Sequence, residues 1–175
     1  LNLHMDGARF ANAVSFLGCD PADITWRAGV DILSFGATKN GAMGAEAVVF
    51  FNLEKAREFE FRRKRGAHLF SKMRYLSAQL DAYLTDDLWL DLAGHANRMA
   101  EEIAKGISAI PGAKLLYPVE ANMIFARLPE VSLECLAVSD IMYYRNGDEE
   151  AGEVRLVTSW NTSEQDVAHL LKVIT

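Results

Sequence analysis

The sequence predicts an α/β protein in its first half and a smaller α+β unit in its second half. Within residues 1–51, short apolar segments typical of strands alternate with a helical pattern and glycine-containing turns. Residues 53–110 then show helical spacing, and residues 113–160 return to short apolar segments. We expect the boundary near residues 85–94. We therefore assign residues 1–88 to one domain and residues 89–175 to a second.

The first half supplies the expected strands. Residues 1–5 alternate as a strand that ends at Asp6, and the helical pattern of residues 7–18 ends on Gly18, a good helix stop. Two more strands are expected at residues 30–36 and 45–51. A glycine-containing loop, residues 37–44, joins them. Lys39 lies on that loop.

Helices dominate the middle of the chain. We expect three of them, over residues 53–66, 68–84 and 86–110. Thr85 or Asp86 can cap the start of the third, and Pro111 with Gly112 ends it. Further strands and helices follow at residues 113–118, 122–129, 132–139, 141–145, 152–160 and from Ser163 onward. Ser163 and Asp166 resemble a capping box with Asp in place of Glu.

The composition is that of an ordinary globular protein. Of the 175 residues, 50% are hydrophobic and 24% are charged, and the net charge of −6 argues against a nucleic-acid binder. There is no apolar run that could cross a bilayer and no signal-peptide pattern, so we expect a cytoplasmic protein with no membrane partner. Cys19 and Cys135 lack metal-ligand spacing and are expected to be free thiols. The basic run at residues 62–65 is either a solvated helix face or an anion site.

Lys39 is the candidate nucleophile. It follows an apolar strand and stands between Thr38 and Asn40. A lysine at the end of a buried strand has to lose water or find a partner, and a partly desolvated amine attacks aldehydes readily. The alternative is that Lys39 merely points into water from a loop.

Asp6 and Arg9 suit a site for pyridoxal phosphate (PLP). A carboxylate beside the pyridine nitrogen keeps the ring protonated, and Asp6 at a strand end can supply it. The alternative is an ordinary helix N-cap. Arg9 lies one helical turn later, where a guanidinium would keep the phenolic oxygen of PLP ionised. The alternative for Arg9 is a surface salt bridge.

Two segments carry a family resemblance. Residues 4–13 (HMDGARFANA) followed by residues 31–51 (DILSFGATKNGAMGAEAVVFF) resemble the L-threonine aldolases of the bacterial low-specificity type. Residues 62–80, 122–129 and 154–167 also resemble family segments, so the likeness covers essentially the whole chain. These aldolases are fold-type I PLP enzymes grouped with the β-eliminating lyases. The resemblance implies that the first domain is part of a PLP-binding large domain with a mixed sheet, and the second the C-terminal small domain.

The resemblance implies a role for each candidate in the first domain. Lys39 would hold PLP as a Schiff base, and Asp6 would pair with the pyridine nitrogen. Arg9 would contact the phenolic oxygen and the substrate. Lys64 and Arg74 resemble positions that help to hold the cofactor phosphate, often across a subunit interface.

In the second domain, Arg155 would bind the substrate carboxylate, because a guanidinium can grip a carboxylate with two hydrogen bonds. An exposed strand residue is the alternative, since residues 153–157 alternate as any half-exposed strand does.

The implied activity is aldol cleavage of L-threonine, L-allo-threonine and related β-hydroxy-α-amino acids to glycine and an aldehyde. A homotetramer or homodimer with shared sites is implied as well. The alternatives are β-elimination, a serine hydroxymethyltransferase-like aldolase, or an inactive fragment. In the family, an earlier part of the chain supplies a phosphate-binding glycine loop and a histidine that stacks on PLP. Neither is found here, and the chain begins at Leu1 in a strand-like pattern, so we expect a missing N-terminal segment to be required.

Overall fold

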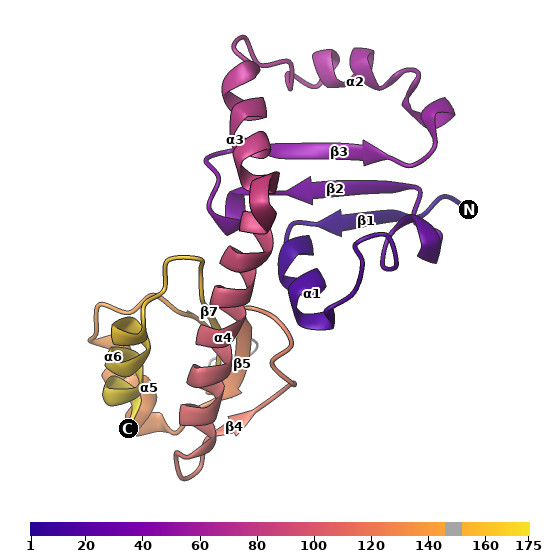
Figure 1. Ribbon diagram of the computed structural model, residues 1–175. Helices are drawn as coiled ribbons and strands as arrows, with labels where there is room; N and C mark the ends of the chain where they lie inside the picture. Colours follow the sequence, from indigo (N-terminus) through magenta and orange to yellow (C-terminus); the bar gives the residue numbers. More distant parts are fainter. Residues whose placement is uncertain (146–151) are drawn as a thin grey trace. The chain divides into compact units, whose positions relative to one another are not determined.

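A computed structural model of the protein describes residues 1–145 and 152–175 (Figure 1). The chain divides into two compact units, Leu1–Leu92 and Ala93–Thr175. The division falls inside helix α4, Leu88–Ser108, which has 21 residues. Across the two described ranges, no helix is both long and apolar enough to span a membrane.

The first unit contains a three-stranded mixed sheet in the order β1-β2-β3 (Figure 1). Strand β1, His4–Gly7, runs parallel to β2, Ile32–Gly36, and β3, Glu46–Phe50, is antiparallel to β2. The carboxyl ends of β1 and β2 therefore lie at the same edge of the sheet. In open α/β sheets this edge is where ligands bind.

An aromatic cluster lies under this sheet. Helix α1, Phe10–Leu17, begins with a buried Phe10 and ends at Gly18, as expected. The ring of Phe35 in β2 lies 6.0 Å from those of Phe10 and Trp89 and 6.1 Å from that of Tyr83. Buried aromatic pairs of this kind contribute both area and preferred geometry, so they fix the ends of the helices that carry Tyr83 and Trp89 against β2.

Two helix predictions after β3 are wrong in extent. Residues 53–66 form a short 3-10 segment, η3 (Leu53–Ala56), and a separate helix α2, Phe59–Arg65. Helix α3 spans Arg74–Leu84 and does not begin at residue 68. The backbone of Ala67 has a φ of 60°, which no right-handed helix allows, so the chain turns there although the apolar spacing continues.

The start of α4 also differs from the prediction. Thr85–Asp87 form a 3-10 segment, η4, and α4 begins at Leu88. Asp86 and Asp87 have φ values of 51° and 57°. Aspartate tolerates this left-handed region better than most residues, so these two residues form the turn between α3 and α4 and do not start a helix.

The second unit is a four-stranded sheet in the order β4-β5-β7-β6, in which all neighbours are antiparallel. Its elements are β4 (Lys114–Leu115), β5 (Met123–Arg127), α5 (Glu130–Ala137), β6 (Tyr144–Arg145), β7 (Glu153–Val157) and α6 (Glu164–Ile174). Helix α5 begins at Glu130 and not at residue 132. The capping box of Ser163 and Asp166 is confirmed at the start of α6.

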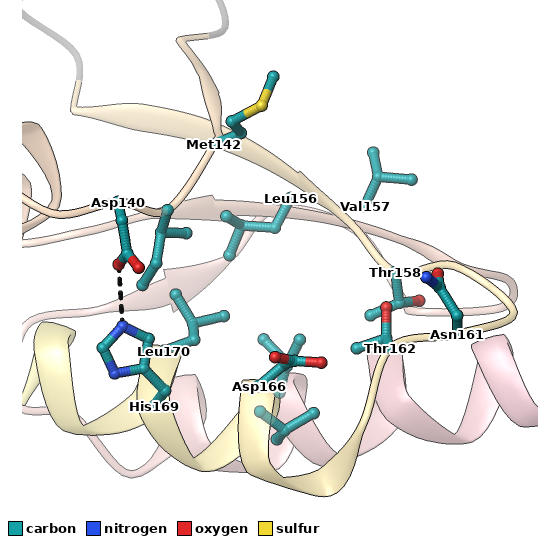
Figure 2. A pocket seen from close by; sticks show the side chains of 13 residues that line it. Asp140, Met142, Leu156, Val157, Thr158, Asn161, Thr162, Asp166, His169 and Leu170 are labelled. Carbon is teal, nitrogen blue, oxygen red and sulfur yellow. Dashed lines mark hydrogen bonds and ion pairs between the residues drawn. The ribbon is translucent and has the colours of Figure 1, made fainter.

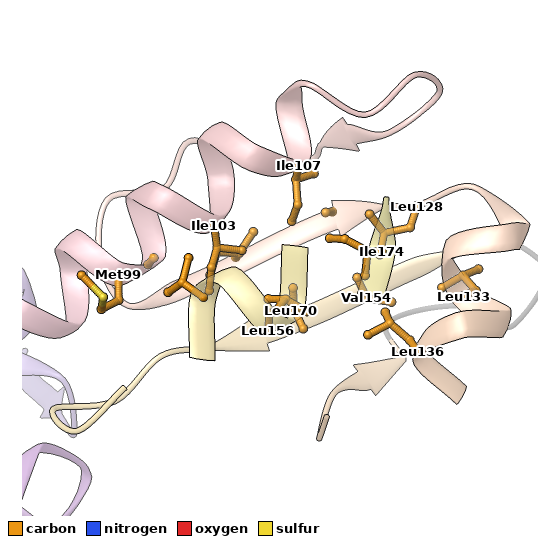
Figure 3. Packing of buried hydrophobic residues seen from close by; sticks show 14 residues of the cluster. Met99, Ile103, Ile107, Leu128, Leu133, Leu136, Val154, Leu156, Leu170 and Ile174 are labelled. Atoms are coloured by element: carbon orange, nitrogen blue, oxygen red, sulfur yellow. The ribbon is translucent and has the colours of Figure 1, made fainter. Parts of the chain in front are cut away.

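Alternate residues of β5 and β7 form the floor of the second core. Ile124 and Val154 have no exposed surface, and they belong to one buried cluster with Ile107 of α4 and Ile174 of α6. Figure 3 shows Val154 within this cluster. Side chains alternate along a strand, so Arg155, between the buried Val154 and Leu156 of β7, lies on the opposite face of the sheet. The core thus fixes which side chains of β7 are available for chemistry.

Replacing Ile124 with alanine is expected to lower the free energy of unfolding by about 2–5 kcal/mol, because a fully buried side chain leaves a cavity. Urea unfolding followed by circular dichroism measures the loss. Val131→Ala is the control, since Val131 on α5 is 70% exposed and its truncation should change stability by less than about 0.5 kcal/mol. Equal effects of the two substitutions would contradict this view of the core.

Candidate active site

Lys39 is the middle residue of a 3-10 turn, Thr38–Asn40, which follows β2 directly. The backbone N–H groups of Asn40 and Ala42 both donate to the carbonyl of Ala37, at 3.0 and 3.2 Å. Gly41 has a φ of 113°, a conformation that favours glycine and turns the chain back toward β3. The side chain of Lys39 is exposed, so the burial suggested by its apolar strand does not extend to its amine.

Asp6 lies near the end of β1 with its carboxylate exposed. Its Oδ1 accepts a hydrogen bond from the N–H of Ala8 at 3.0 Å, so Asp6 closes a tight turn. The N-cap position of α1 is occupied by Arg9, which rules out the simple capping role for Asp6. Arg9 itself is half-buried in the turn between β1 and α1.

A close backbone approach brings the turns of Asp6 and Lys39 together. A Cβ atom added at Gly36 would lie 2.9 Å from the Cα of Ala8, a separation that real Cβ atoms essentially never show. Ala8 follows Asp6 by two residues, and Gly36 precedes Lys39 by three. The carboxylate and the amine are thus carried by two touching turns at the carboxyl edge of β1 and β2.

Glu46 at the start of β3 lies against the same turn. One carboxylate oxygen accepts a hydrogen bond from the N–H of Thr38 at 3.3 Å, and the other would be 2.8 Å from a Cβ at Gly36. The sequence alone gives no signal for Glu46, because its position opposite Gly36 depends on the register of β2 and β3.

Asn40 points into the protein while its neighbour Lys39 points out. Its side chain is 3% exposed, and its Nδ2 donates to the Oη of Tyr83 at 2.6 Å and to the carbonyl of Trp89 at 2.8 Å. Burial raises the pKa of Tyr83, and the negative charge of Glu46 raises it further, while the bond from Asn40 acts in the opposite direction. Tyr83 is therefore a neutral phenol under ordinary conditions.

Lys64 lies on α2, and Arg74 is the first residue of α3. Both side chains are exposed. The guanidinium of Arg74 stacks 4.8 Å from the ring centroid of Tyr75. In residues 1–92, which the structure describes throughout, no hydrogen bond or ion pair joins Lys64 or Arg74 to the Lys39 turn. Arg62, the first residue of the basic run, pairs with Glu58 at 3.2 Å.

In the second unit, Arg155 lies at the centre of β7, opposite Phe125 of β5 and Tyr144 of β6. Its guanidinium carbon is 4.3 Å from the ring centroid of Tyr144. The Nε of Arg155 is buried and has no hydrogen-bond partner in the two ranges that the structure describes. A guanidinium stacked in this way keeps its N–H edge available for a planar anion such as a carboxylate.

A pocket of about 330 Å³ lies beside β7 and α6 of the second unit (Figure 2). His169 and Asp140 are hydrogen-bonded there, with Nε2 and Oδ1 3.0 Å apart, and this bond lowers the pKa of Asp140. Leu156 and Val157 of β7 line the pocket, as does Thr158 after the strand, but Arg155 does not. The pocket is therefore separate from the candidate carboxylate-binding residue.

Comparison with known proteins identifies the family of the chain. Residues 1–130 match the β-eliminating lyase family. A low specificity L-threonine aldolase from Pseudomonas aeruginosa is 46% identical over 174 residues, which cover 99% of this chain and 50% of that protein. A low specificity L-threonine aldolase from a Pseudomonas species is also 46% identical, over 97% of this chain and 49% of its own length.

Solved structures show the same fold. A threonine aldolase from Leishmania major superposes with a TM-score of 0.89 at 31% identity, over 99% of this chain and 51% of that one. A putative L-allo-threonine aldolase from Listeria monocytogenes, at 16% identity and a TM-score of 0.70, shares the fold over 99% of this chain and 51% of its own. The chain spans about half the length of these relatives. The expected fold class is confirmed, and the chain belongs to the β-eliminating lyase family.

Proposed function

We propose that the protein uses PLP to cleave β-hydroxy-α-amino acids, including L-threonine and L-allo-threonine, into glycine and an aldehyde. The observation that carries this proposal is the contact between the Asp6 turn and the Lys39 turn at the carboxyl edge of β1 and β2. The similarity to low specificity L-threonine aldolases supports the choice of reaction.

The residues at this edge fit PLP chemically. The amine of Lys39 is exposed, and no carboxylate in residues 1–92 forms an ion pair with it, so it is available to condense with an aldehyde. Asp6 uses one carboxylate oxygen for its own turn, and its second oxygen has no hydrogen-bond partner among the described residues. When bound, PLP supplies an electron sink for the bond that breaks at the substrate α-carbon.

Each residue has a defined task in this proposal. Asp6 keeps a proton on the pyridine nitrogen, and Arg9 holds the phenolic oxygen and contacts the substrate. Lys64 and Arg74 are proposed to bind phosphate. Arg155 orients the substrate through its carboxylate, with Tyr144 holding the plane of the guanidinium.

We further propose a cytoplasmic homotetramer or homodimer whose partner is a small amino-acid substrate. Family likeness supports the oligomer, and the free thiols of Cys19 and Cys135 support a reducing compartment. Residues 1–88 are proposed as part of the PLP-binding large domain and residues 89–175 as the small domain.

The test is product identification with the complete gene product, PLP and L-threonine. We expect glycine and acetaldehyde in equal amounts. An oxoacid and ammonia would instead support β-elimination. Reduction with borohydride followed by peptide mapping should place the cofactor on Lys39. A cofactor trapped on a different lysine, or on none, would remove the proposed site.

Replacing Arg155 with alanine is expected to raise the KM for amino acids, because a charge-assisted pair worth about 2–5 kcal/mol is lost, while kcat changes little. Steady-state kinetics with L-threonine measures the effect. Arg98→Ala, which removes an exposed arginine of α4, is the matched control and should leave KM unchanged. A normal KM for the Arg155→Ala variant would assign this residue to the sheet alone.

A further inference from the structure

We infer that Asn40 and Tyr83 are positioning residues for Lys39, an inference that rests on the proposed attachment of PLP to this lysine. Asn40 is the last residue of the turn whose middle residue is Lys39. Asn40 and Tyr83 are 3% and 4% exposed, and they are joined by a hydrogen bond of 2.6 Å. The exposed amine is therefore carried by a turn whose next residue is fixed in the core.

The partners of Asn40 determine how its amide is oriented. The carbonyl of Trp89 can only accept, so the atom that faces it at 2.8 Å has to be Nδ2. The same Nδ2 also donates to Tyr83, so both of its hydrogens are used. The opposite orientation of the amide would place two acceptors face to face, which makes this arrangement specific for asparagine.

Helix α3 holds the loop that carries Lys39 at two points. Tyr83 accepts from Asn40, and the Oε1 of Gln79 accepts from the backbone N–H of Met43 at 2.6 Å. Gln79 and Tyr83 are four residues apart, so they lie on the same side of the helix. One helix face thus fixes the loop on both sides of Gly41, the residue at which the chain reverses.

Aromatic packing holds Tyr83 and Trp89, the two partners of Asn40, in place. The ring of Trp89 stacks on that of Phe10 at 6.2 Å with an angle of 11° between the planes, and both Trp89 and Tyr83 contact Phe35 of β2. Phe35 lies on β2, the strand that leads into the turn. The turn therefore contacts its own strand through Asn40, Tyr83, Trp89 and Phe35. Chemistry between two groups depends strongly on such fixed placement.

The test compares two variants that each lose one hydroxyl from α3 of the complete gene product. Tyr83→Phe removes the acceptor for Asn40, and Tyr75→Phe removes an exposed hydroxyl of the same helix. We expect the equilibrium constant for the borohydride-trappable adduct of PLP on Lys39 to fall about 3–10-fold in Tyr83→Phe, the size of one net hydrogen bond. Tyr75→Phe should match the parent protein.

Amide hydrogen exchange gives a second readout that needs no cofactor. The N–H groups of Asn40 and Ala42 should exchange faster in Tyr83→Phe than in Tyr75→Phe, while both melting curves stay cooperative. Asn40→Ala should have a larger effect in the same direction. If that variant does not fold, Tyr83→Phe decides alone.

Equal adduct constants and equal exchange rates in the Tyr83→Phe and Tyr75→Phe variants would overturn the inference. A parent protein that traps no PLP on Lys39 would instead refute the proposed function. In that case the exchange rates still decide whether Tyr83 holds the turn.

Discussion

Replacement of Lys39 with alanine is expected to reduce threonine cleavage on the order of 10⁴–10⁶-fold, as when the covalent nucleophile of an enzyme is removed. The side chain is exposed and contributes nothing to the core, so the fold should be retained. The measurement is kcat together with the absorbance of the protein–PLP imine near the visible edge, which should disappear.

Two controls make this result specific. Lys39→Arg keeps the positive charge but cannot form the imine, so it should be as inactive as the alanine variant. Lys172→Ala removes an exposed lysine from α6 and should behave as the parent protein. Near-normal turnover of Lys39→Ala, with an intact imine band, would mean that a different lysine binds the cofactor.

Replacement of Asp6 with asparagine is expected to lower kcat about 10³–10⁴-fold, the scale seen when a carboxylate that fixes the protonation state of its partner is neutralised. The turn should persist, because asparagine can accept the same bond from Ala8. Asn52 shows this directly, since its Oδ1 accepts from the N–H of Glu54 at 2.9 Å. Steady-state kinetics and thermal melting together separate the loss of catalysis from any loss of stability.

Asp20 provides the matched control for the Asp6 experiment. Its Oδ1 accepts from the N–H of Ala22 at 2.9 Å, so it closes the same kind of turn in the same unit. Asp20→Asn also weakens an exposed ion pair with Arg27, which should cost little. If Asp6→Asn and Asp20→Asn had the same small effect on kcat, Asp6 would have no place at the cofactor.

Strands β2, β3, β5 and β7 were predictable because each reads as a short apolar segment bounded by turn residues. The strands expected at residues 113–118 and 141–145 are shorter, since only Lys114–Leu115 and Tyr144–Arg145 pair with a neighbouring strand. The helices between β3 and α4 were not, because Ala67, Asp86 and Asp87 leave the helical region without any break in the apolar spacing. Ser163 and Asp166 were predictable because both members of the capping box lie within one helical turn.

The residues of the candidate site likewise differ in whether a local sequence pattern reveals them. Asp6 and Lys39 each follow a recognisable strand, so a local pattern is enough to find them. Glu46, Gln79 and Tyr83 reach the Lys39 loop only through strand register and helix packing, which join residues up to 43 positions apart. The stacking of Arg155 on Tyr144 likewise depends on the pairing of β6 with β7.

The glycine at position 36 sets a practical limit for anyone who wishes to evolve new substrate preferences in this protein. Any larger residue there meets the backbone of Ala8 and the carboxylate of Glu46, so it would separate the Asp6 turn from the Lys39 turn. Most members of a library randomised at position 36 would therefore fail to bring the two turns together. Diversity is better placed around Arg155, which lies on β7 of the second sheet and is not part of either turn.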